Sequence, residues 1–311
     1  MNLRDLRYVI SVAELGHFGR ASVACNVSQP TLSGQILKLE EELGVAIFER
    51  VGKRVRLTPV GDQIVAHARR SVAAASDIIA TARASRDPLS GTVRLGVIPT
   101  IAPYLMPYAL PAVALAMPRA PLTLVEDLTG RLLPLLGDGE LDAAIIATDV
   151  LGDRLDEFQL YEEPFYLVMP GDHPMAGQKT IEASSIDVAS LLLLTDGHCL
   201  REQALDLCER ARSSGAAADV RAASLETLLQ LTAAHYGLTL APALAVLGLR
   251  DDPRLAAAPI AGGRASRKVR LAYRRDMPRR QAISTLAGAI RDGLTVAGVG
   301  DLGIVIGDAD H

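Results

Sequence analysis

Two cysteines in the second half of the chain lie in a segment that could carry redox chemistry. Cys199 lies between His198 and Arg201, and Cys208 follows nine residues later. The thiolate, not the thiol, attacks oxidants, so the surroundings of each sulfur decide its reactivity. One helical face of this segment is apolar, formed by Leu200, Ala204, Leu207 and Ala211. This spacing predicts a helix starting at Cys199, where the helix dipole and nearby positive charge stabilise a thiolate, with Cys208 beside the buried stripe.

The cysteines also have a plainer interpretation, because free cysteines are often small buried hydrophobic residues. Cys25 lies on the apolar face of a short helix, where that interpretation is favoured, and we assign it no redox role. Three cysteines in 311 residues do not make a structural disulfide framework, so a bridge would be transient or regulatory. His235 has no partner at metal-ligand spacing. We expect no bound metal and no cofactor.

Composition limits the classes to which the chain can belong. A hydrophobic content of 49% over 311 residues supports two or three buried cores. A net charge of -4 excludes a protein that coats nucleic acid along its whole surface, so any basic DNA-binding surface must be local. The first residues do not resemble a secretory signal, and the apolar stretch 108–117 is too short to span a bilayer. We therefore expect a cytoplasmic protein without membrane contact.

The first sixty residues carry a pattern of three short helices. Ser28 is a good N-cap with Pro30 in the first turn, and the buried stripe of the third helix is predicted at Leu32, Ile36, Leu39 and Leu43. The remaining positions of this helix hold short or amide side chains and one lysine, which can hydrogen-bond base edges and phosphates: Gln29, Thr31, Ser33, Gln35 and Lys38. Alone, this pattern also fits an ordinary surface helix, because helix-turn-helix spacing is degenerate.

The segment that follows favours DNA binding. Residues 50–60 contain four basic side chains and no acid: Arg50, Lys53, Arg54 and Arg56. An alternating basic stretch of this kind suits a β-wing that reaches phosphates.

At this point the sequence resembles the LysR-type transcriptional regulators. The resemblance lies in FGRAS at 18–22, VSQPTLS at 27–33, LEEELG at 39–44, FER at 48–50 and LTPVG at 57–61. It implies a winged helix-turn-helix DNA-binding domain over residues 1–58, whose third helix enters the major groove.

Residues 59–90 are predicted to form a long linker helix. Apolar residues recur at steps of three and four in a heptad pattern: Val65, Ala68, Val72, Ala75, Ile79 and Ala82. A two-stranded coiled coil is one interpretation, and a helix packed on its own domain is the other. The resemblance favours a dimer, assembled further into a dimer of dimers.

Residues 91–311 alternate short β-rich runs with amphipathic helices, which predicts an α/β architecture. Thr100 follows the first predicted strand and Thr129 follows the second, at the strand ends where such folds bind ligands. Both threonines could instead simply cap helices. The resemblance implies two subdomains, as in periplasmic binding proteins, with a small effector held between them.

The segment DGHCLREQALDLC at 196–208 resembles the redox segment of OxyR-type peroxide sensors within this family, as do VIPT at 97–100, SLETL at 224–228 and APALAV at 241–246. This resemblance implies that Cys199 reacts with hydrogen peroxide and that Cys208 resolves the product to a disulfide, with Thr100 and Thr129 positioning the peroxide. Nine residues of helix rise about 13 Å, whereas a disulfide needs Cα atoms within about 7 Å. Oxidation must therefore remodel the helix.

The resemblance also implies the partners: promoter DNA of antioxidant genes, RNA polymerase, further copies of the chain, and a thiol reductant such as glutaredoxin or thioredoxin. Two alternatives stay open. One is a regulator that responds to a small organic effector, and the other is an enzyme, a thiol peroxidase, which also needs a reactive and a resolving cysteine. Replacing Cys199 by serine distinguishes the first alternative from a peroxide sensor, because a regulator that binds an organic effector keeps its response without this thiol.

Overall fold

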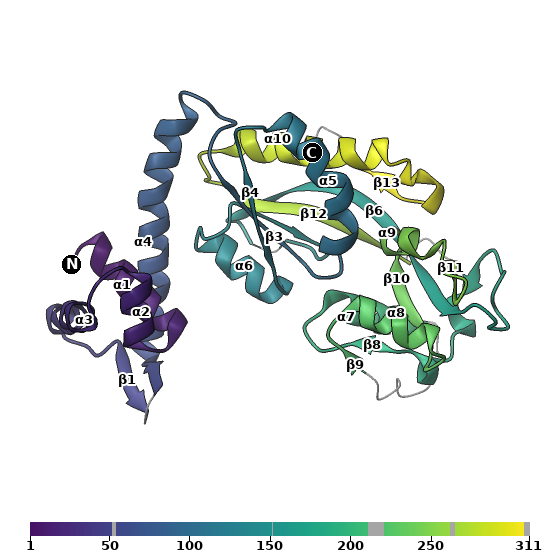
Figure 1. Cartoon of the computed structure of the whole chain (residues 1–311), viewed down its shortest axis with the longest axis horizontal. Coiled ribbons are helices and arrows are strands. Elements are labelled where there is room, and N and C mark those ends of the chain that lie inside the picture. The colour runs from purple at the N-terminus through teal and green to yellow at the C-terminus, as the bar shows by residue number, and fades with distance from the viewer. Residues whose placement is uncertain (52–53, 151, 211–220, 262–264, 308–311) are drawn as a thin grey trace. The chain divides into compact units, whose positions relative to one another are not determined.

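The computed structural model describes residues 1–51, 54–150, 152–210, 221–261 and 265–307 (Figure 1). The chain divides into two compact units. One contains Met1–Arg86 with Gly137–Glu140, and the other contains Asp87–Leu136 with Leu141–His311. The domain boundaries expected at residues 58 and 90 stay predictions, but the long helix packs with the N-terminal unit through contacts with the first helix.

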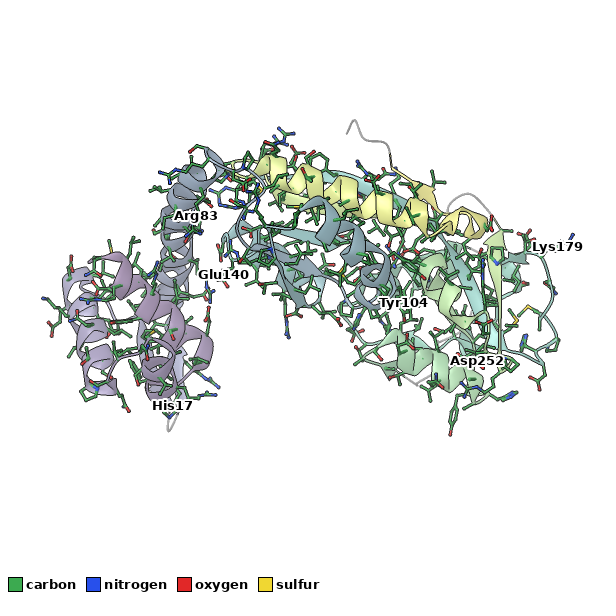
Figure 2. All side chains as sticks on the ribbon, turned by 45° about the horizontal axis from the view of Figure 1, so that its top comes forward. His17, Arg83, Tyr104, Glu140, Lys179 and Asp252 are labelled. Carbon is green, nitrogen blue, oxygen red and sulfur yellow. The ribbon has the colours of Figure 1, made fainter. Side chains whose placement is uncertain are left out.

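The N-terminal unit contains four helices and a two-stranded wing: α1 (Leu3–Leu15), α2 (Phe18–Ala24), α3 (Gln29–Leu43), β1 (Phe48–Val51), β2 (Arg54–Leu57) and α4 (Pro59–Ala84). Each of the four helices starts at a side-chain cap. Asn2 caps α1, His17 caps α2 (Figure 2), Ser28 caps α3 and Thr58 caps α4. These caps satisfy backbone N–H groups that have no partner inside the helix, and they fix where each helix begins.

The core of this unit lies between α1, α3 and the start of α4. Leu32, Ile36 and Leu39 of α3 are almost fully buried, as predicted, and Cys25 packs half-buried against the same cluster. The prediction for Leu43 is wrong, since it is 39% exposed. Leu43 is the last residue of α3, and the chain turns at Gly44, so the stripe ends one turn earlier.

The second unit is built on a mixed sheet with the strand order β4-β3-β5-β12-β6-β11-β7, in which β10 and β13 also pair with β6. Its strands are β3 (Val93–Val97), β4 (Leu122–Glu126), β5 (Ala143–Ile146), β6 (Leu155–Pro170), β7 (Ile181–Glu182), β10 (Thr239–Pro242), β11 (Leu255–Ala261), β12 (Ser266–Arg274) and β13 (Val305–Ile306). Strands β3, β4 and β5 are parallel, whereas β12 runs antiparallel to β5 and β6. The predicted α/β class is confirmed.

The long strand β6 is shared by two parts of this unit. Its first ten residues pair with β12, and its last six pair with β10 and β11. The first part of the unit holds β3, β4 and β5 with the helices α5 (Ala102–Ala116), α6 (Thr129–Gly137) and α10 (Arg280–Val296). The second holds a small parallel sheet, β8 (Leu193–Leu194) with β9 (Arg221–Ala222), and the helices α7 (Cys199–Arg210), α8 (Leu225–Ala233) and α9 (Ala243–Val246).

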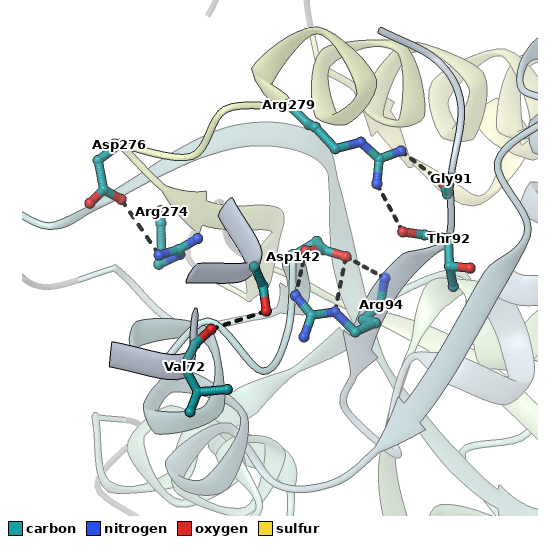
Figure 3. A network of polar contacts seen from close by, with 9 residues as sticks. Val72, Gly91, Thr92, Arg94, Asp142, Arg274, Asp276 and Arg279 are labelled. Carbon is teal, nitrogen blue, oxygen red and sulfur yellow. Dashed lines mark hydrogen bonds and ion pairs between the residues drawn. The ribbon is translucent and has the colours of Figure 1, made fainter. Parts of the chain in front are cut away.

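Polar contacts fix the start of the first strand. Arg94 on β3 donates from its backbone N–H and its guanidinium to the carboxylate of Asp142, with N–O distances of 2.7 and 2.8 Å (Figure 3). Arg279, just before α10, donates to the carbonyl oxygens of Gly91 and Thr92, both at 2.8 Å. These contacts tie the start of β3 to Asp142 and to the segment that precedes α10.

Among the described residues, no helix has both the length and the apolar character needed to cross a bilayer.

Candidate functional site

A small pocket lies at the start of α7. It is lined by the loop after β3, the start of α6 and the turn into α7: Ile98, Pro99, Thr100, Leu128, Thr129, Gly197, His198 and Cys199. Thr100 and Thr129 follow the parallel strands β3 and β4, whose carboxyl ends meet at one edge of the sheet. Gly197 has a φ of +95°, a conformation that favours glycine, and it turns the chain into α7 beside Leu128. Four of the predicted site residues therefore line one pocket: Thr100, Thr129, His198 and Cys199.

The sulfur of Cys199 lies at the first residue of α7, as predicted, but its environment differs from the expectation. Cys199 is only 8% exposed, and burial raises the pKa of its thiol. The positive charge of Arg267 and the backbone N–H groups of Cys199 and Leu200 act in the opposite direction, toward the thiolate. Burial has the larger effect, because a thiolate loses its hydration in the pocket.

The positive charge near the sulfur comes from Arg267 on β12. Its guanidinium donates from Nη1 to Thr100 Oγ1 and from Nη2 to the Thr100 carbonyl oxygen, both at 3.0 Å. Because the Thr100 hydroxyl oxygen accepts from Arg267, its own hydrogen is free to donate elsewhere. Thr100 also lines the pocket, so this hydrogen can be donated to a molecule beside Cys199.

The two residues expected to supply positive charge do not do so. His198 is buried, and loss of solvation lowers the pKa of its imidazole, which keeps the ring neutral near pH 7. Arg201 does not line the pocket. It pairs with Asp196 at 3.0 Å and donates to the Leu194 carbonyl oxygen at 3.3 Å, and so it ties the preceding loop to α7.

Cys208 belongs to the last turn of α7, and its side chain lies outside the described residues. The helix is continuous from Cys199 to Arg210, so the two cysteines are separated by the helical rise that the sequence predicts. The next ten residues, 211–220, also lie outside the described part of the chain.

The predicted recognition helix, α3, has an exposed start. The Ser28 side chain accepts from the backbone N–H of Thr31 at 3.3 Å, and its hydroxyl contacts the Thr31 hydroxyl at 2.8 Å. Gln29, Pro30, Thr31 and Lys38 are exposed, whereas Ser33 and Gln35 are partly buried. A polar helix end of this kind can approach base edges and phosphates.

The predicted wing is present as the antiparallel pair β1 and β2, in which Arg50 lies opposite Val55 and Arg54 lies opposite Val51. The side chains of Arg50 and Arg54 and the whole of Lys53 lie outside the described residues. Arg56 on β2 is exposed. The backbone of the wing thus agrees with the prediction, and its contacts with DNA stay a prediction.

Two family models match the chain. The bacterial regulatory helix-turn-helix of the LysR family matches residues 3–62, and the LysR substrate binding domain matches residues 86–295. This chain belongs to the LysR family. The resemblance found in the sequence is therefore confirmed at the level of the family, and a winged helix-turn-helix followed by an α/β regulatory domain is the architecture of this LysR-family protein.

Relatives of this LysR-family protein carry names that refer to hydrogen peroxide. The chain is 40% identical to the hydrogen peroxide-inducible genes activator of Dickeya chrysanthemi, with 94% of this chain and 95% of the relative covered. It is also 40% identical, with the same coverage, to the DNA-binding transcriptional dual regulator OxyR of Escherichia coli K12.

Solved structures of OxyR proteins have the same fold. A full-length OxyR variant of Pseudomonas aeruginosa superimposes with a TM-score of 0.78 at 39% identity, covering 94% of this chain and 95% of that one. A hydrogen peroxide-bound OxyR mutant of Corynebacterium glutamicum gives 0.66 at 34% identity, covering 100% and 98%.

Two charged residues beside the pocket, Arg267 and its partner Glu163, were not predicted from the sequence. Both are charged, and both are almost fully buried. They are 104 positions apart in the sequence, and only the pairing of β6 with β12 brings them together. A faint signal was available, since Glu163 directly precedes the apolar run 164–169, and a charge that is buried with such a run needs a partner.

Proposed function

We propose that this LysR-family protein is a DNA-binding transcription activator that senses hydrogen peroxide through Cys199 and controls antioxidant genes. The observation that carries the proposal is the pocket in which Cys199 meets Thr100, Thr129 and His198. The names of the relatives, hydrogen peroxide-inducible genes activators and OxyR proteins, support it.

The size of the pocket favours peroxide over an organic effector. The cavity beside Cys199 measures about 10 Å³, close to the space that one water molecule needs. Pockets that enclose drug-sized organic molecules measure about 300 Å³ or more. A molecule of two oxygen atoms is much closer to this size than an organic effector is, and two hydroxyl groups, those of Thr100 and Thr129, are on residues that line the cavity.

In the proposed reaction, the Cys199 thiolate attacks one oxygen of hydrogen peroxide. A sulfur–oxygen bond forms, the oxygen–oxygen bond breaks, and the leaving hydroxide takes a proton to become water. The product is a sulfenic acid. The Cys208 thiolate then attacks the Cys199 sulfur, a disulfide forms, and a second hydroxide leaves and is protonated.

The second step requires α7 to change conformation, because about nine residues of helix separate the sulfurs by more than a disulfide can span. We propose that the remodelled segment alters contacts between copies of the chain and repositions the DNA-binding units. The exposed start of α3, with the wing residues Arg50, Lys53 and Arg54, is the proposed DNA-binding surface.

The partners of the proposed function are promoter DNA, RNA polymerase and further copies of this chain, paired through α4 and assembled as a dimer of dimers in the cytoplasm. A thiol reductant, glutaredoxin or thioredoxin, returns the disulfide to two thiols. We propose a regulator and not a thiol peroxidase, because a DNA-binding unit serves regulation and not turnover.

The test begins with fully reduced protein and equimolar hydrogen peroxide. Remaining thiols are labelled with an alkylating mass tag, and peptides are mapped by mass spectrometry. We expect a bridge between Cys199 and Cys208 with Cys25 still alkylated, and no bridge in Cys199→Ser. If Cys199 and Cys208 stay reduced, the peroxide function is wrong and an organic effector is favoured. Sustained consumption of peroxide with a thiol reductant at enzymatic rates indicates a thiol peroxidase.

A further inference from the structure

Glu163 and Arg267 form a buried ion pair between the two long strands of the second unit. They lie directly opposite each other in the register of β6 and β12. Arg267 donates from Nε to Glu163 Oε1 at 2.9 Å, its Nη2 lies 2.9 Å from the same oxygen, and the two side chains are 1% and 0% exposed. Neither charge has access to water, so each depends on the other for compensation.

The remaining hydrogen bonds fix the pair in one orientation. The second carboxylate oxygen, Glu163 Oε2, accepts from the backbone N–H of Leu244 in α9 at 2.9 Å. On the other side, the guanidinium donates to the hydroxyl and carbonyl oxygens of Thr100. Glu163 therefore connects α9 to a pocket residue through Arg267, although it does not line the pocket.

The charges around Cys199 come from several elements. Arg267 from β12 favours the thiolate, and Glu202, one turn into α7, opposes it. The pKa of His198 is lowered, so that it adds no positive charge near pH 7. Tyr161 on β6 is buried near the ion pair, and its pKa is raised well above the usual value, so it stays neutral. Arg267 is therefore the cation that the thiolate senses, and Glu163 partly neutralises it.

We propose that Glu163 is a positioning residue for the peroxide reaction: it fixes the guanidinium of Arg267 against Thr100 and, as the counter-charge, limits how strongly that guanidinium favours the Cys199 thiolate. This inference rests on the proposed function, because the tuned property is the reactivity of Cys199. A purely structural ion pair makes a different prediction, since its loss lowers stability without moving the titration of Cys199.

The experiment measures the rate of iodoacetamide alkylation at Cys199 against pH in the full-length reduced protein, read from the Cys199 peptide by mass spectrometry. In Glu163→Gln the amide keeps the shape and a hydrogen-bonding oxygen, but the charge is lost. Arg267 then acts on the thiolate without compensation. We expect the midpoint of the titration to fall by about one pH unit, the lower end of the shift that a nearby opposite charge produces.

The matched control is Glu157→Gln. Glu157 is also on β6 and accepts from Arg270 Nε of β12 at 2.8 Å, but that pair is partly exposed and Arg270 also pairs with Asp149. This control removes a carboxylate from another ion pair between the same two strands. We expect the titration midpoint of Cys199 to equal that of the wild type. A midpoint in Glu163→Gln that equals or exceeds that of Glu157→Gln overturns the proposal.

A second variant covers the case in which Glu163→Gln does not fold, because it leaves a buried guanidinium without its counter-charge. Glu163→Gln combined with Arg267→Gln replaces the ion pair by two neutral amides. We expect its Cys199 midpoint above that of the wild type, since Arg267, the cation that favours the thiolate among the described residues, is lost. A midpoint at or below the wild type contradicts the proposal.

These results are separate from the proposed function itself, because alkylation needs no peroxide. If wild-type Cys199 fails to react with peroxide, the function fails, whatever the midpoints are. If Cys199 reacts with peroxide and the midpoints do not move, only the assignment of Glu163 fails.

Discussion

The side-chain amide of Gln203 on α7 donates a hydrogen bond to the backbone carbonyl oxygen of Ala147 at 2.9 Å. Ala147 directly follows β5, whereas Gln203 lies four residues into α7, the helix whose remodelling the proposed disulfide requires. Unwinding α7 at Gln203 would break this contact. It therefore stabilises the reduced conformation and opposes the change that brings Cys208 to Cys199.

Replacing Gln203 by leucine removes this contact and leaves the Ala147 carbonyl without its donor. A hydrogen bond contributes about 1 kcal/mol to the conformation that makes it. The equilibrium between the reduced and the remodelled conformation should therefore shift about fivefold toward the remodelled one. We expect faster formation of the Cys199–Cys208 disulfide after a peroxide pulse, followed by quenched mass spectrometry. Gln230→Leu, at an exposed position of α8, is the control and should keep the wild-type time course.

Thr100→Val tests the hydroxyl that accepts from Arg267. Valine has the same shape but can neither accept from the guanidinium nor donate into the pocket. Loss of one positioned donor typically slows a reaction by about a hundredfold, and we expect a fall of that order in the second-order rate constant with hydrogen peroxide.

Thr232→Val is the matched control for Thr100→Val. Thr232 is fully buried in α8, and its hydroxyl donates to the Leu228 carbonyl oxygen at 3.0 Å. Removing this hydroxyl should affect stability without changing the peroxide rate. Equal rates in the two variants would show that the Thr100 hydroxyl takes no part in the reaction.

Burial of His198 predicts a pH dependence of stability. Loss of solvation lowers the pKa of His198 in the folded state, so the unfolded chain binds a proton first as the pH falls. Stability contributed by the neutral ring is complete above the unfolded pKa, about 6.5, and is lost as the pH falls from there through the folded pKa. We expect His198→Asn to lose less stability than the wild type between neutral and acidic pH in urea unfolding.

The control for this measurement is His235→Asn. His235 is exposed and has a positive φ of 63°, a conformation that asparagine tolerates well. Its replacement should leave the pH dependence of unfolding as it is in the wild type. If the free energy of unfolding of His198→Asn falls with pH as steeply as that of the wild type, another group causes the acid sensitivity.

Much of the fold could be predicted because local signals repeat along the chain. The caps at Ser28 and Thr58 and the start of α7 at Cys199 follow from residue type and spacing. The first half of β6 is harder to predict. Residues 155–164 are rich in acids, yet they pair with β12, where Arg267 and Arg270 supply the opposite charges.

The electrostatics of Cys199 could not be predicted for the same reason. Sequence neighbours indicated His198 and Arg201 as the sources of positive charge. Burial neutralises the first, and Asp196 pairs with the second. The cation that acts on the sulfur, Arg267, is 68 positions away and reaches the pocket only through the sheet. Strand pairing over such a separation leaves no local pattern in a single sequence.

Lys38 on α3 should contribute to DNA binding through phosphate contact. Each phosphate contact by a cation adds about one to the slope of log affinity against log salt concentration. We expect Lys38→Ala to reduce this slope by about one on a genomic fragment selected by the wild-type protein. Lys179→Ala is the control, at an exposed lysine of the second unit (Figure 2), and should keep the wild-type slope.

The long helix α4 supplies the last prediction. The first half of the predicted dimer seam, Val65 and Ala68, is buried within its own unit, whereas Ile79 in the second half is 54% exposed. The predicted partner helix of a second copy would cover this isoleucine. Ile79→Glu introduces a charge into this seam, so we expect it to shift the protein toward monomers in sedimentation velocity. Thr81→Glu, on about the opposite side of the helix, should stay oligomeric like the wild type. An unchanged sedimentation coefficient for Ile79→Glu would place the dimer contact outside this half of α4.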